Sequence, residues 1–201
     1  MIISVFNRKG GVGKTTLAIN LALLLEYPIV TNDENPSIMI DTMPEGSVLA
    51  LAEDDSFPEI APGTNVLLDF EGKVESRVAA GLEITKGVIV PTRNDPLTMQ
   101  KTVDCIRDIK AYTDKIVVVA NSISKPRSGE NVDTNYIDIK KLIASHYPGL
   151  PVCQLKNSTY IEDVFANKVS IKERIDQVYG AQKTYARNAM QQLTNIIGAL
   201  K

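Results

Sequence analysis

The chain has 201 residues, of which 44% are hydrophobic and 23% are charged, and its formal net charge is −2. This length and composition are sufficient for one α/β domain whose core needs no disulfide or metal for support. The near balance of charge excludes a general electrostatic attraction to nucleic acid or to anionic membranes. Any polyanion would therefore have to bind a local basic patch.

The cysteines and the termini indicate where such a protein works. Cys105 and Cys153 lie without metal-ligand spacing, as buried thiols of a reducing compartment do. The sequence has no signal peptide, no apolar run long enough to span a bilayer and no internal repeat. We therefore expect a cytoplasmic protein with a single domain over residues 1–201.

The predicted strand at residues 1–6 runs directly into a glycine-rich turn, and a helix-period pattern of leucines follows. The turn contains Lys9, Gly10, Gly11, Val12, Gly13, Lys14, Thr15 and Thr16. Glycines allow successive backbone N–H groups to surround a phosphate, and the start of the helix adds positive potential. In such a loop Lys14 reaches the β- and γ-phosphates of a nucleotide, and the Thr15 hydroxyl is a ligand for Mg²⁺.

The remaining elements alternate along the chain. After a first helix that ends near Glu26, apolar runs predict strands at residues 28–33, 37–41, 65–69, 87–91, 115–120 and 151–155. Helix-like spacing predicts helices at residues 47–52, 74–84, 97–112, 136–146 and 182–200, whereas residues 124–133 have loop composition. Strands that are apolar on both faces favour an α/β fold with a mostly parallel central sheet and helices on both faces.

Polar residues follow several of these strands, at the sheet edge where α/β proteins bind their ligands. Asp69 fits the carboxylate that holds a metal-bound water in phosphate-loop proteins. Residues 69–72 have the form D-x-x-G, in which the N–H of Gly72 would sense a γ-phosphate. Asn121 is a candidate for contact with the adenine base, and a helix or turn cap is the alternative for it.

The loop departs from the common form G-x-x-x-x-G-K-[ST], because Arg8 stands where a glycine is expected and a second lysine, Lys9, follows it. The pattern K-G-G-x-G-K-[ST]-T resembles the deviant loop of the family that includes ParA and MinD. In that family the lysine matched by Lys9 crosses a dimer interface to the partner's nucleotide. The resemblance implies an ATPase that binds ATP with Mg²⁺ and forms a homodimer.

The resemblance extends to residues 65–100 and to two segments near the end, 155–160 and 167–171, which resemble the short plasmid-partition ATPases typified by ParF. It implies non-specific DNA binding, a centromere-binding adaptor protein that stimulates hydrolysis, and association with the nucleoid in the cytoplasm. The candidate DNA contacts are the basic residues Lys168, Lys172, Arg174, Lys183 and Arg187.

The acid that orients the attacking water has two candidates. In ParA-like proteins the second strand ends in D-x-D, and the second acid has this role. One alignment places the pair on Thr31 and Asp33; the other uses residues 41–46, which resemble D-T-D-P-Q-G but carry Met43 at the second acid. We favour Asp33, because its strand then follows the first helix directly, as a βαβ unit requires. Asp41 remains the alternative.

Three other functions use related loops. A MinD-like positioning ATPase needs a basic amphipathic membrane anchor. Residues 186–200 do form an apolar stripe, but the opposite face of that helix is mostly Asn, Gln and Thr, as in a helix docked on a sheet. No membrane contact is therefore expected. A small-molecule ligase in the style of dethiobiotin synthetase is a further alternative, for which the sequence marks no substrate pocket. The cysteine positions disfavour an iron–sulfur reductase.

Overall fold

The computed structural model describes residues 1–72, 74–123 and 133–200. Its centre is a seven-stranded sheet in the order β3-β2-β4-β1-β5-β6-β7, and every pairing is parallel. The strands are β1 Ile2–Phe6, β2 Ile29–Thr31, β3 Val48–Ala50, β4 Val66–Phe70, β5 Gly87–Thr92, β6 Ile116–Ile123 and β7 Val152–Lys156. The predicted α/β fold with a mostly parallel sheet is confirmed.

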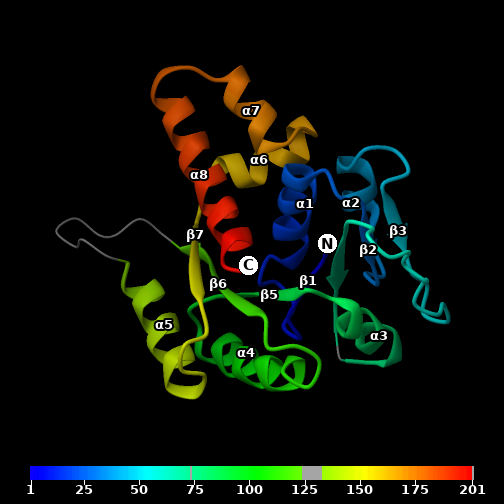
Figure 1. Cartoon of the computed structure of the whole chain (residues 1–201). Coiled ribbons are helices and arrows are strands. Elements are labelled where there is room, and N and C mark those ends of the chain that lie inside the picture. Colours follow the sequence, from blue (N-terminus) through cyan, green and yellow to red (C-terminus); the bar gives the residue numbers. More distant parts are fainter. Residues whose placement is uncertain (73, 124–132, 201) are drawn as a thin grey trace.

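Helices cover both faces of this sheet (Figure 1). One layer contains α1, α2, α6, α7 and α8, and the other contains α3, α4 and α5. Their bounds are α1 Lys14–Leu25, α2 Ser37–Thr42, α3 Ser76–Ile84, α4 Pro96–Ile109, α5 Thr134–His146, α6 Thr159–Asn167, α7 Ile171–Gln177 and α8 Gly180–Gly198. Within the described ranges, no helix combines the length and the apolar character that crossing a bilayer requires.

Each face of the sheet contributes a separate apolar cluster, because successive residues of a strand point to opposite faces. In β5, Ile89 packs with the layer of α1 and α8, whereas Val88 and Val90 pack with the layer of α3, α4 and α5. All three side chains are fully buried. This two-sided burial is the physical reason for the continuous apolar runs in the sequence.

The segment between β2 and β4 differs from the prediction. Residues 37–41 are not a strand but part of α2, and residues 47–52 are not a helix but contain β3. Met39 and Met43 are buried four residues apart, while Ile38 and Ile40 are 47% and 54% exposed. That pattern suits a helix with one buried face. β3 lies at the sheet edge, where a strand needs less apolar character than in the centre.

The helices α6 and α7 occupy a segment for which the sequence predicts only a turn. Their capping residues are present: the Ser158 side chain accepts from the Tyr160 N–H, and Ser170 and Glu173 form a capping box. The S-x-x-E pattern at Ser170 is the sequence signal for α7. The predicted loop at residues 124–133 lies outside the described residues except for Asp133, whose side chain caps α5.

Candidate nucleotide site

The glycine-rich loop joins the end of β1 to the start of α1 in the backbone conformation that its glycines permit. Gly11 has a φ of 75° and Gly13, the N-cap of α1, has a φ of 87°, which are left-handed values that side chains disfavour. A Cβ at Gly10 or Gly11 would meet no atom within 4 Å. The loop therefore opens onto free space in which an anion can approach the backbone and the N-terminus of α1.

Two side chains at the start of this loop anchor it to the neighbouring elements. The buried Asn7 amide donates to the Pro91 carbonyl at 2.8 Å and to Thr102 Oγ1 at 3.1 Å. Arg8, which stands where the common motif has glycine, forms an ion pair with Asp108 of α4 at 2.7 Å. The loop is thus tied to β5 and α4 before its glycines begin.

Lys14 extends along the inside of the loop and is only 6% exposed. Its ammonium group donates to the Lys9 carbonyl at 3.4 Å and lies 3.5 Å from Glu71 Oε1. The Lys9 side chain forms no ion pair with the described residues, and its charge helps to lower the pKa of Asp95 at the start of α4, after the hydrogen bonds from Thr98. Lys14 is therefore an internal cation of the loop, whereas the Lys9 side chain is only partly buried.

Thr15 and Asp69 meet at the adjacent ends of α1 and β4. The Thr15 hydroxyl donates to Asp69 Oδ2 at 3.4 Å, and Asp69 Oδ1 is buried without a hydrogen-bond partner. Burial raises the pKa of Asp69 to about 7; the Lys14 charge opposes this rise, and the charges of Asp33 and Glu71 add to it. A buried carboxylate with one oxygen that has no partner, next to a threonine hydroxyl, fits the oxygen ligands that Mg²⁺ prefers.

The same carboxyl edge of the sheet contains Asp33 and Gly72. Asp33 follows β2, and the described residues around both positions enclose a cavity of about 960 Å³. Gly72 has a φ of 80°. Asp41 lies elsewhere, exposed on α2, and no strand ends at it.

Asn121 lies against the phosphate loop. Its amide donates to the Val12 carbonyl at 2.7 Å, and its oxygen accepts from the Ser122 N–H. Ser122 has a φ of 55°, an uncommon value for a residue with a side chain. Asn121 also lines a small cavity of about 80 Å³ together with Gly13, Thr16, Arg93, Lys156 and Glu162. The residue is thus in place to support the loop, and it borders a space beside it.

The candidate DNA contacts lie on α7 and α8 and, for Lys168, directly after α6, and several already have acidic neighbours. Lys172 is 4.0 Å from Glu26, and Arg174 is 3.7 Å from Asp163. A further ion pair joins Lys183 to Asp176 at 4.0 Å. Lys168 and Arg187 are exposed. Ion pairs with acidic residues therefore offset the charge of three of these five basic residues.

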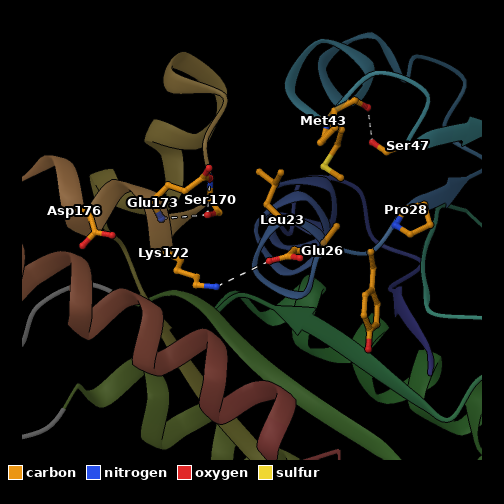
Figure 2. Close-up of a pocket in the computed structure, with 12 residues that line it drawn as sticks. Leu23, Glu26, Pro28, Met43, Ser47, Ser170, Lys172, Glu173 and Asp176 are labelled. Atoms are coloured by element: carbon orange, nitrogen blue, oxygen red, sulfur yellow. Dashed lines mark hydrogen bonds and ion pairs between the residues drawn. The ribbon is translucent and has the colours of Figure 1, made fainter.

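A third cavity, of about 620 Å³, lies at the far end of α1 from the phosphate loop (Figure 2). Leu23 and Glu26 of α1, Met43 after α2, and Lys172 of α7 line it, and the Lys172–Glu26 ion pair crosses it. Since α1 has 12 residues, this cavity is roughly 18 Å from the loop. It shares no lining residue with the two cavities described above and is separate from the site built by Lys14, Thr15 and Asp69.

Sequence reasoning missed two residues of the site, Asn32 and Glu71. The Asn32 side chain accepts from the Glu71 N–H at 2.7 Å and donates to the Glu71 carbonyl at 3.2 Å. The sequence does contain a signal for Asn32, because it is a polar residue directly after a strand, at the edge of the sheet where ligands bind.

A glycine-rich loop between the first strand and helix of a parallel sheet, with a lysine, a threonine hydroxyl and a carboxylate beside it, defines a phosphate-loop nucleotide-binding protein. The family model described as the CobQ/CobB/MinD/ParA nucleotide binding domain matches residues 3–171. The chain therefore belongs to this family, which confirms the predicted kinship with ParA and MinD.

Solved structures share the fold over almost their whole length. Apo McdA of Cyanothece has a TM-score of 0.72 and 10% identity, with coverage of 100% of this chain and 99% of that chain. Pyrococcus horikoshii MinD complexed with Mg-ADP has a TM-score of 0.64 and 12% identity, with coverage of 100% of this chain and 98% of that chain. A candidate plasmid partition protein of Borrelia burgdorferi bound to AMPPNP has a TM-score of 0.55 and 13% identity, with coverage of 98% of this chain and 97% of that chain. No curated protein matches the sequence.

Proposed function

We propose that this chain is a DNA-partition ATPase. In this proposal it binds ATP with Mg²⁺, dimerises, binds DNA without sequence specificity, and is reset by hydrolysis that a centromere-binding partner stimulates. The observation that carries the nucleotide part is the convergence of Lys14, Thr15 and Asp69 beside an open glycine loop. The family assignment supports it, because the matching domain is a nucleotide-binding domain.

Each residue of the site has a role in this proposal. The loop N–H groups and the Lys14 ammonium bind the phosphates, the Thr15 hydroxyl would be a ligand of Mg²⁺, and Asp69 would hold a metal-bound water. When bound, Mg²⁺ neutralises charge on the phosphate oxygens. The remaining groups complete the site: Asp33 orients the attacking water, the Gly72 N–H faces the γ-phosphate, and Lys9 reaches the partner subunit's nucleotide. Positioning and charge, rather than covalent chemistry, supply the rate.

The DNA part of the proposal rests on the resemblance to ParF-like ATPases and on the basic residues of α7 and α8 with Lys168. A solved neighbour is itself described as a candidate plasmid partition protein. Lysine and arginine contacts to DNA phosphates release counterions, so the binding should weaken steeply with salt. Lys168, Lys172 and Arg187 are the exposed members of the set, and we expect the largest contribution from them.

The packing of α8 bears on the MinD-like alternative, which needs a membrane anchor. Its apolar residues Ala186, Ala189, Leu193, Ile196 and Ile197 are buried, and α8 packs on the sheet next to β7. An anchor would require this stripe to be free for lipid. The packing of α8 therefore favours DNA over a membrane surface as the partner of the proposed dimer.

The test is binding to non-specific duplex DNA without nucleotide, with ADP and with ATP, each at two salt concentrations and with light scattering for mass. We expect a dimer and salt-sensitive DNA binding with ATP only. A triple Lys168→Ala, Lys172→Ala, Arg187→Ala variant should dimerise with ATP but bind DNA less tightly. An ATP dimer without DNA affinity would overturn the cargo assignment, and turnover that depends on a metabolite would indicate the ligase alternative.

A further inference from the structure

The side chain of Asn32 continues the pairing of β2 with β4 beyond the point where their backbones part. The ladder between the two strands ends at Thr31 and Asp69. One residue later the Asn32 amide bonds both the N–H and the carbonyl of Glu71, at 2.7 and 3.2 Å. Asn32 is 7% exposed, so this two-point contact is shielded from water. It fixes the Glu71 backbone at the start of the loop that contains Gly72.

The position of Glu71 places its carboxylate against the lysine of the phosphate loop. Glu71 Oε1 lies 3.5 Å from Lys14 Nζ, and Lys14 is buried while the Glu71 side chain is 48% exposed. Asp33 and Asp69 lie near the same pair, because the charges of Lys14, Asp33 and Glu71 all act on the Asp69 carboxyl. A phosphate group that binds the Lys14 ammonium must therefore displace or repel the Glu71 carboxylate.

We propose that Asn32 is a positioning residue that holds Glu71 so that its carboxylate competes with the nucleotide phosphates for Lys14. The inference rests on the proposed function, since it takes Lys14 as the phosphate-binding lysine. The competition sets the affinity for nucleotide rather than the chemistry of hydrolysis. Because Asn32 grips only the Glu71 backbone, the side chain can turn away from Lys14 when a phosphate arrives, while the loop stays tied to the segment that carries Asp33.

The first experiment measures Mg²⁺-ADP affinity by calorimetry, which needs no hydrolysis and no dimer. A Glu71→Gln variant should bind ADP about fivefold more tightly, the size expected from removing one partly exposed ion pair. Glu34→Gln is the matched control, because Glu34 is an exposed acid lining the same cavity and its removal changes the net charge equally. Equal tightening by both variants would reduce the effect to general charge and overturn the competition.

The second experiment is a double-mutant cycle that asks whether Asn32 acts through the Glu71 carboxylate. Asn32→Ala should tighten ADP binding about twofold in the parent chain and leave it unchanged in the Glu71→Gln background. Weaker binding in both backgrounds, with the fold intact by thermal melting, would show a merely structural role and overturn the proposal. Failure of the parent chain to bind ADP would instead overturn the proposed function.

Discussion

Thr15 Oγ1 lies 3.4 Å from Asp69 Oδ2, a contact that joins the start of α1 to the end of β4. It is the one hydrogen bond to the Asp69 side chain among the described residues, and the second carboxylate oxygen has none. A buried carboxylate with so little compensation destabilises the fold when it is charged. The site thus carries a cost that a bound cation would remove.

Stability should therefore depend on the charge of Asp69. Its pKa is about 7 in the folded chain against an ordinary value of 3.8, so the folded state holds the proton more tightly. The stabilisation that comes from holding this proton is complete below about pH 4, and it is lost as the pH rises through 7. Asp69→Asn should raise the free energy of unfolding at pH 8 by about 4 kcal/mol and leave it nearly unchanged at pH 4. Denaturant titrations at both pH values measure this, with Asp54→Asn as an exposed control.

The two ends of the glycine loop should differ in their tolerance of a side chain. A Cβ at Gly13 would lie 2.3 Å from Asn121 Nδ2, and the φ of Gly13 is 87°. We expect Gly13→Ala to cost about 1–3 kcal/mol of stability. Gly10→Ala, where a Cβ meets no atom within 4 Å, should be nearly neutral by chemical denaturation. Equal losses at both positions would contradict this account of the loop.

The choice between the two candidate acids can be tested by a matched pair of substitutions. Asp33 follows β2 at the edge that contains Lys14 and Asp69, whereas Asp41 is exposed on α2. Asp33→Asn should therefore lower ATP turnover by about 10²-fold or more while ADP binding persists, as expected for loss of a group that positions the reacting water. Asp41→Asn should keep the parent turnover. The reverse result in a phosphate-release assay would assign the role to Asp41.

Lys9 should matter only when two subunits meet. It has no ion pair with the described residues of its own chain, so its removal should leave ADP affinity within about twofold. With ATP, Lys9→Ala should stay monomeric in light scattering, because the cation that completes the partner's site is missing. Lys86→Ala, an exposed lysine before β5, should dimerise like the parent chain. A Lys9→Ala chain that dimerises and turns over normally would rule out the cross-subunit role.

The parts of the fold that the sequence predicts well are those with strong local patterns. β1, the glycine loop and α1 have apolar runs, glycines and helix spacing that all agree, and β4, β5 and β6 are apolar on both faces. Residues 37–41 misled the prediction because Ile38, Met39 and Ile40 favour strand locally. Tertiary contacts decide otherwise, since only Met39 of the three reaches the core.

The site could be predicted only where a residue's chemistry is part of a motif. Lys14, Thr15 and Asp69 are placed by motif and strand order, and the structure brings their side chains to one end of the sheet. Asn32 and Glu71 could not be paired from sequence, because they are 39 positions apart and meet only through the register of β2 with β4.

The central place of β1 in the sheet affects how the protein is made. β1 pairs with β4 and β5, so Ile2 meets Val66 and Ile3 meets Gly87. During synthesis this apolar strand must wait for roughly sixty to ninety further residues before its backbone is satisfied, because pairing of distant segments is slow and leaves apolar surface exposed. The segment that builds the phosphate loop is thus exposed to aggregation until β4 and β5 have been made.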